Sequence, residues 1–302
     1  MHPKAGLNGG THTPRQGGRK RIRFQGVFVN KSKTFQFITE RQRRWAEAKD
    51  LVVTANGRLS RIEDNLFAPL HAETRADFEA ADGDEFGTAD VVGKMYSLHS
   101  SSALVCNMFD HWRKRPLLPL LQACGIETSG SDLRFEQKFA TGVGSKPANL
   151  DVLITDTGTG CLPIAVESKF TEPFQTGERD CLKPAYFHKS NTWDELSVCQ
   201  RIAERLTAEG LFKCLRAAQL LKHTLALTRK FGKRQFILLY LWYDVQGSEA
   251  AKQHRSEVQE FGNLLGDDVL FRSDTYQNIF DRLSALTPGS PYEKYLRSRY
   301  FN

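Results

Sequence analysis

Two short apolar stretches that lie close together in the chain constrain its fold most strongly. Residues 150–155 and 162–170 are rich in β-branched and aliphatic side chains, and a Thr-Gly-Thr-Gly segment at residues 157–160 separates them. Two such runs joined by a turn-forming segment predict a β-hairpin. Because both runs are mostly apolar, we expect the two strands to be buried.

Three charged side chains interrupt this apolar hairpin. Asp151 lies on the first strand, and Glu167 and Lys169 lie on the second. Side chains alternate between the faces of a strand, so Glu167 and Lys169 share one face, and Asp151 can lie opposite them. Two carboxylates suit a hard divalent cation, and charges in a buried strand are costly unless they are paired or metal-bound. The alternative is an ordinary ion pair on a solvated sheet.

An acid followed, after a hairpin, by acid-x-lysine resembles the motif of the PD-(D/E)xK nuclease superfamily. Here the motif stands as Asp151 and then Glu167-Ser168-Lys169, although Leu150 rather than proline precedes the first acid. The resemblance implies that Asp151, Glu167 and the backbone carbonyl of Ser168 bind Mg²⁺, for which Mn²⁺ can substitute. It also implies that Lys169 orients or activates the attacking water, and that the substrate is DNA.

The order of the expected elements is similar to the αβββαβ core of that superfamily. Residues 99–114 and 211–228 predict helices, and the expected strands cover residues 133–140, 150–155, 162–170 and 235–243. We therefore expect an α/β, restriction-endonuclease-like fold, with a central mixed sheet flanked by helices. A disordered basic arm is expected over residues 1–22, an extension packing on the core over residues 23–95, and the nuclease-like domain over residues 96–302.

The expected helix at residues 211–228 is apolar around most of its circumference and should be largely buried. Arg216, Gln219 and His223 form a narrow polar stripe on it, at spacings of three and four residues. In the nucleases that the chain resembles, a helix after the motif strands lines the active cleft. Gln219 and His223 are therefore expected near the scissile phosphate, as further catalytic residues. The alternative is a polar stripe that faces solvent and has no role in chemistry.

Positive charge is concentrated at the N-terminus. Residues 1–50 contain twelve Lys or Arg and three acids, a net charge of +9, whereas the remaining chain has thirty basic and thirty-two acidic residues. Basic residues alternate with Phe24, Phe28, Phe35 and Phe37, a pattern that suits phosphates and stacked bases. The alternative is a solubilising tail and an ordinary strand pair whose phenylalanines face the core. A short helix is expected around residues 40–50.

An acidic stretch at residues 73–90 contains seven acids and one arginine. Asp84 and Glu85 are the members best placed to supply a further metal ligand, because they lie in a glycine-containing loop. Asp110, on the first expected helix, and Glu136, on the first expected strand, are weaker candidates for an auxiliary acid. Acidic runs of this kind are more often simply solvated.

The rest of the sequence indicates additions to the core and a reducing environment. Residues 248–265 and 276–286 predict helices, with a short strand at residues 269–273 between them. The six cysteines are widely spaced without a CxxC pair, as is typical of free thiols in a reducing compartment. No apolar run matches a bilayer and the N-terminus lacks a signal-peptide pattern, so a cytoplasmic location is expected.

These features predict a metal-dependent nuclease that hydrolyses DNA by in-line attack of an activated water. Endonuclease and exonuclease action both stay open, as does cleavage of RNA, and a homodimer is possible because many enzymes of this resemblance are dimers. The alternative from a different class is a catalytically silent nucleic-acid-binding or assembly protein on the same scaffold. A plain interaction protein, with an acidic loop and a basic arm, is the third possibility.

Overall fold

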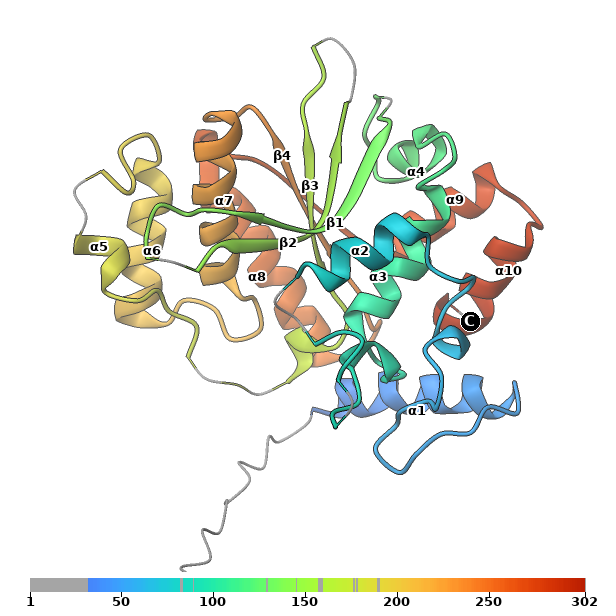
Figure 1. Cartoon of the computed structure of the whole chain (residues 1–302). Helices are drawn as coiled ribbons and strands as arrows, with labels where there is room; N and C mark the ends of the chain where they lie inside the picture. Colours follow the sequence, from blue (N-terminus) through green and yellow to red (C-terminus); the bar gives the residue numbers. More distant parts are fainter. Residues whose placement is uncertain are drawn as a thin grey trace, which may run out of the picture.

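The computed structural model contains a five-stranded mixed sheet with helices on both faces (Figure 1). It describes residues 32–301, apart from residues 82–83, 89, 129, 145, 157–159, 176, 178 and 189–190. The expected basic arm at residues 1–22 therefore lies outside the described residues. The strands are β1 (Asp132–Phe139), β2 (Ala148–Thr155), β3 (Ile164–Lys169), β4 (Ile237–Trp242) and β5 (Leu270–Thr275).

The strands follow one another across the sheet in the order of the sequence. β1, β2 and β3 are antiparallel neighbours, whereas β3, β4 and β5 are parallel neighbours. The expected αβββαβ order is confirmed, because α3 (Ser101–Phe109) precedes β1 and α7 (Ala217–Phe231) lies between β3 and β4. Parallel pairing of β3 with β4 requires a crossover, and helices α5 (Ala185–His188), α6 (Ser197–Glu209) and α7 form it.

Helices cover the two faces of the sheet in two groups. One apolar cluster joins the sheet to helices α1 (Lys33–Glu47), α2 (Ala72–Glu79), α3 (Ser101–Phe109), α4 (Leu118–Ala123), α9 (Tyr276–Leu286) and α10 (Pro291–Leu296). A second cluster joins the opposite face to α5 (Ala185–His188), α6 (Ser197–Glu209), α7 (Ala217–Phe231) and α8 (Glu249–Leu265). We call these the α3 face and the α7 face of the sheet. The fold is thus three-layered, and no helix among the described residues is long and apolar enough to cross a bilayer.

The first helix begins earlier than the sequence indicated. Ser32 caps α1 by accepting a hydrogen bond from the backbone N–H of Phe35, so the helix covers the segment for which a strand pair was the alternative. Phe35 is buried and Phe37 is 54% exposed, as expected for positions on opposite sides of an amphipathic helix. The alternative of a strand pair is therefore wrong at these two phenylalanines.

The expected helix at residues 211–228 was also wrong at its start. Residues 211–216 are not helical, and α7 begins at Ala217. The buried carboxylate of Glu257, on α8, accepts hydrogen bonds from the backbone N–H groups of Lys213, Cys214 and Leu215, at 2.8–2.9 Å. A remote side chain thus satisfies backbone donors that a helix would have used, and no local pattern reports such a contact.

Candidate active site between strands β2 and β3

Strands β2 and β3 separate at the positions of the two motif acids. Their ladder covers Val152 to Ile154 paired with Ile164 to Val166 and then stops, although β3 continues to Lys169. Figure 1 shows β2 turning away from β3 at this point. The backbone N–H of Ser168 donates to Asp151 Oδ2 at 2.6 Å instead of to a strand neighbour. The Asp151 carboxylate therefore occupies the opening between the two strands.

Glu167 lies at the centre of a buried polar cluster on the α7 face. Its side chain is fully buried, Lys169 donates to its Oε1 atom, and Nε2 of His223 lies 2.9 Å from its Oε2 atom. The His223 contact has the distance of an ion pair but not the alignment of a hydrogen bond. Glu167 Oε2 and both ring nitrogens of His223 are consequently buried without a hydrogen-bond partner among the described residues.

Burial and charge shift the two motif acids in opposite directions. Burial favours the neutral form of Glu167, but Lys169 and His223 together outweigh it and hold the pKa at about 2. Burial also disfavours a charged Lys169, yet Glu167 and Asp151 raise the pKa of this ammonium above its ordinary value. The pKa of Asp151 is raised, first by burial and then by the negative charge of Glu167. A site with two buried acids and one cation has an excess of negative charge.

Glu136 adds a third acid beside Asp151. The pairs Phe135–Val152 and Gln137–Leu150 on either side place it opposite Asp151 in the β1–β2 register. Burial and then the charge of Glu85 raise the pKa of Glu136 to about 7, although Asn149 donates a hydrogen bond to its carboxylate. Glu85 is itself buried, so two of the auxiliary acids suggested by the sequence lie near the site.

The other two suggested acids lie elsewhere. Asp84 is exposed to solvent. The carboxylate of Asp110 accepts hydrogen bonds from the side chain and the backbone N–H of His71 and from the Thr74 hydroxyl, on the α3 face of the sheet. In the described part of the chain these contacts do not join Asp110 to the motif acids, and the role of Asp84 and Asp110 as auxiliary ligands stays a prediction.

A cavity of about 660 Å³ opens beside Lys169 and His223. Gln219 lines it from α7, as the spacing of four residues from His223 predicts. Its wall also carries three further cations, those of Arg179, Arg216 and Lys222. The sequence pointed to Arg216 only as part of a helical stripe, whereas it caps α7 in the structure. Lys222 lies three residues from Gln219, a spacing that could have placed it on the same wall.

The side chains between β2 and β3 fit a hard cation. Among the described residues, no group of three or more His, Cys, Asp or Glu side chains is arranged to hold a metal, so Asp151 and Glu167 are the available pair. Magnesium commonly takes one or two carboxylates and completes its coordination with water and substrate oxygens. The unpartnered Oε2 of Glu167 is a buried acceptor of the kind that such an ion satisfies.

A mixed sheet whose strands β2 and β3 separate between Asp151 and the Glu167-Ser168-Lys169 sequence defines a restriction-endonuclease-like protein. The model of the family described as "Restriction Endonuclease associating with ARP" matches residues 40–301, and the chain belongs to that family. The expected membership of the PD-(D/E)xK superfamily is confirmed, and a DNA nuclease is the class of protein that the family defines. No curated protein and no solved structure matches the chain.

Proposed function

We propose that this chain is a metal-dependent deoxyribonuclease that hydrolyses a phosphodiester bond between strands β2 and β3. One observation carries the proposal: Glu167 is fully buried beside Asp151 and Lys169 where two strands separate, and its Oε2 atom, 2.9 Å from Nε2 of His223, has no aligned hydrogen bond among the described residues. A purely structural ion pair would be expected to satisfy both carboxylate oxygens, because an unpaired buried acceptor costs about 1–3 kcal/mol. Family membership supports the same function.

Asp151, Glu167 and the backbone carbonyl of Ser168 would hold Mg²⁺, with Mn²⁺ as a substitute. Alternation along β3 directs the backbone N–H and carbonyl of Ser168 toward β2, because the carbonyl of the next residue, Lys169, accepts a hydrogen bond on the other side from the N–H of Tyr243, the residue after β4. When bound, the cation would neutralise charge on the phosphate and lower the pKa of a coordinated water. The excess negative charge of two carboxylates beside one ammonium would attract the cation to this site.

Lys169 would orient the attacking water and stabilise negative charge as it develops on the phosphate. Its pKa is raised by Glu167 and Asp151, although burial acts against it, so this side chain is an ammonium at neutral pH. A charged ammonium donates hydrogen bonds and does not accept a proton. We therefore assign Lys169 electrostatic stabilisation and positioning rather than the role of a general base. His223 would position Glu167, and Gln219 would contact the phosphate from the cavity wall.

The direct test is cleavage of supercoiled plasmid, linear duplex and single-stranded DNA with Mg²⁺ or Mn²⁺ and with EDTA. We expect metal-dependent cutting by the parent and loss of cutting in Glu167→Gln and Lys169→Met, with DNA binding and circular dichroism retained. The three substrates separate nicking from exonuclease action. Retained cleavage by Glu167→Gln would contradict the assignment of the active site to these residues.

The second candidate is a nucleic-acid-binding or assembly protein on the same scaffold. The basic excess of residues 1–50 favours nucleic-acid binding under either hypothesis. Complete inactivity of the parent on all three substrates, with DNA binding intact, would favour this second candidate. A homodimer is also proposed, and sedimentation equilibrium with and without DNA tests it.

A further inference from the structure

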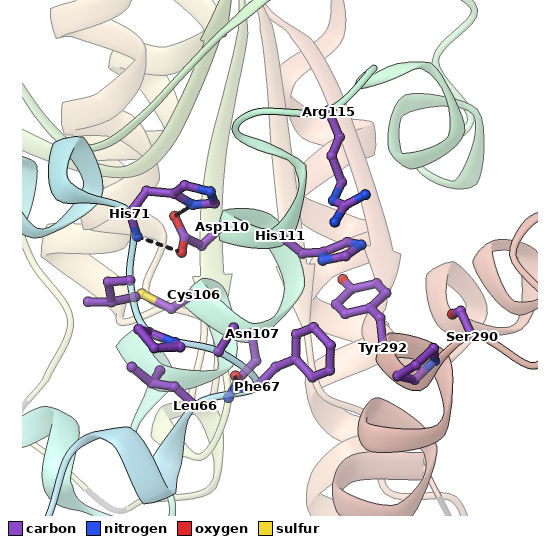
Figure 2. A pocket seen from close by; sticks show the side chains of 14 residues that line it. Leu66, Phe67, His71, Cys106, Asn107, Asp110, His111, Arg115, Ser290 and Tyr292 are labelled. Atoms are coloured by element: carbon purple, nitrogen blue, oxygen red, sulfur yellow. Dashed lines mark hydrogen bonds and ion pairs between the residues drawn. The ribbon is translucent and has the colours of Figure 1, made fainter.

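A second cavity, of about 430 Å³, lies on the α3 face of the sheet (Figure 2). Three separate parts of the chain enclose it: the loop at residues 66–71, the C-terminal end of α3 with the residues after it, and the start of α10. His223 and Lys169 line a different cavity, beside α7. The α3-face cavity is therefore separate from the proposed active site, and its volume is within the range of small-molecule sites.

The charges that line this cavity leave one cation without an acidic partner. Asp110 is already satisfied, because its oxygens accept hydrogen bonds from His71 and from Thr74. Arg115 forms no ion pair in the part of the chain that the structure describes, and Figure 2 shows its guanidinium extending toward His111. Burial, and then the charge of Arg115, lower the pKa of His111 to about 4, so His111 is neutral at physiological pH. The free positive charge of the cavity is thus that of Arg115.

Aromatic rings form another side of the cavity. The ring of His111 stacks on that of Tyr292, with centroids 4.0 Å apart and an angle of 11° between the planes. Phe67 meets both rings edge to face, at 5.6 Å and 5.3 Å. Leu66 and Cys106 line the cavity with apolar atoms, and burial raises the pKa of the Cys106 thiol, which keeps it uncharged. A planar ring is the ligand group that this surface would contact best.

We propose that the cavity on the α3 face binds a small anionic ligand with a planar aromatic ring, of the nucleoside monophosphate class. The ring would pack against Phe67 and the His111–Tyr292 stack, and the phosphate would pair with Arg115. An arginine side chain supplies the planar donor fork that suits phosphate oxygens. Neutral His111 can donate one hydrogen bond and accept another, which suits the polar edge of a base.

The ligand would connect parts of the chain that are distant in sequence. The loop at residues 66–71 precedes α2, and α10 begins more than two hundred residues later, yet both line the cavity. A molecule bound there contacts both segments and α3 only in the folded state, so it must raise the stability of the fold by mass action. Thermal unfolding therefore reports binding without any need for nuclease activity.

The test is titration of the full-length protein with adenosine 5′-monophosphate, adenosine and inorganic phosphate. Calorimetry and thermal unfolding measure the binding of each compound. We expect saturable binding of the monophosphate that is tighter than binding of either fragment. Arg115→Gln should weaken it roughly tenfold or more, because a charged pair is lost. Phe67→Leu should weaken binding of the monophosphate but leave the affinity for inorganic phosphate unchanged.

Two control variants locate the bound molecule. Lys114 is the exposed neighbour of Arg115 and does not line the cavity, so Lys114→Gln should leave the affinity unchanged. Lys222 lines the cavity beside α7, and Lys222→Gln tests whether the nucleotide enters the proposed active site instead. The proposal is overturned if the parent shows no saturation up to about 10 mM, if Lys114→Gln weakens binding as much as Arg115→Gln, or if only Lys222→Gln weakens it.

Discussion

Glu136 lies opposite Asp151 in the register of β1 and β2, and this position interrupts a ladder whose pairs continue on both sides. The backbone of Glu136 has φ of +50°, a left-handed conformation that costs a non-glycine residue about 1–2 kcal/mol. The side chains of β1 change faces at this point. Phe135 packs on the α3 face and Phe139 on the α7 face, although regular alternation would place both on the same face. Strain at one residue thus places an additional carboxylate beside a motif acid.

The charge of Glu136 should make the metal-free protein less stable at neutral pH. Burial and Glu85 raise its pKa in the folded protein from an ordinary value of 4.5 to about 7. The folded state therefore binds a proton more tightly than the unfolded state, and the charged form costs stability above about pH 7. We expect Glu136→Gln to be more stable than the parent there, by on the order of 1 kcal/mol.

This advantage should shrink as the pH falls from about 7 and disappear below about pH 4.5, where the parent carboxyl becomes protonated in both states. Urea unfolding in EDTA across this pH range measures it. A stability difference that does not change with pH would mean that the glutamine acts through packing or backbone strain and not through charge.

Glu167 and Lys169 should be strongly coupled in the metal-free protein. Each single variant, Glu167→Gln or Lys169→Met, removes the partner of a buried charge and is expected to cost about 3 kcal/mol of unfolding free energy. The double variant leaves neither charge and should cost less than the sum of the singles by roughly 1–3 kcal/mol. A matched cycle on the exposed pair Arg205–Glu209 should show no resolvable coupling. Additivity at Glu167 and Lys169 would show that the two side chains do not interact in solution.

The sequence predicted the arrangement of the motif better than the arrangement of its surroundings. Asp151, Glu167 and Lys169 could be placed together, because strand alternation and a hairpin fix their faces. The positive φ of Glu136 left no trace in residue type, since a glutamate is not expected to adopt it. Burial of Glu85 was equally hidden, because an acidic loop ordinarily indicates a solvated segment.

The start of α7 depends on a contact that the local sequence cannot report. The carboxylate of Glu257 accepts hydrogen bonds from the backbone N–H groups of Lys213, Cys214 and Leu215. These bonds fix the conformation of the segment that leads to Ala217. Glu257→Ala should destabilise the protein by about 3 kcal/mol or more, because hydrogen bonds to a charged group are lost and buried donors stay unpaired. Hydrogen exchange of the three amides should accelerate.

Glu260 on the same helix is exposed and supplies the matched control. Glu260→Ala should change the unfolding free energy by less than about 0.5 kcal/mol. Equal effects of the two alanine variants would indicate that general helix charge, rather than the capture of these amides, stabilises the segment.

His223 and Gln219 lie one turn apart on α7 and should affect different steps of the proposed reaction. Nε2 of His223 lies 2.9 Å from Oε2 of Glu167, and we expect this contact to hold the orientation of a proposed metal ligand. His223→Asn is expected to raise the Mg²⁺ concentration for half-maximal cleavage by about tenfold or more, as loss of a group that orients a ligand does. Gln219 lines the cavity and, among the described residues, forms no hydrogen bond with the motif acids, so Gln219→Ala should raise KM for DNA and leave the Mg²⁺ midpoint unchanged. Cleavage rates measured over a matrix of Mg²⁺ and DNA concentrations separate the two effects. A shift of the Mg²⁺ midpoint in Gln219→Ala, or none in His223→Asn, would contradict this division of roles.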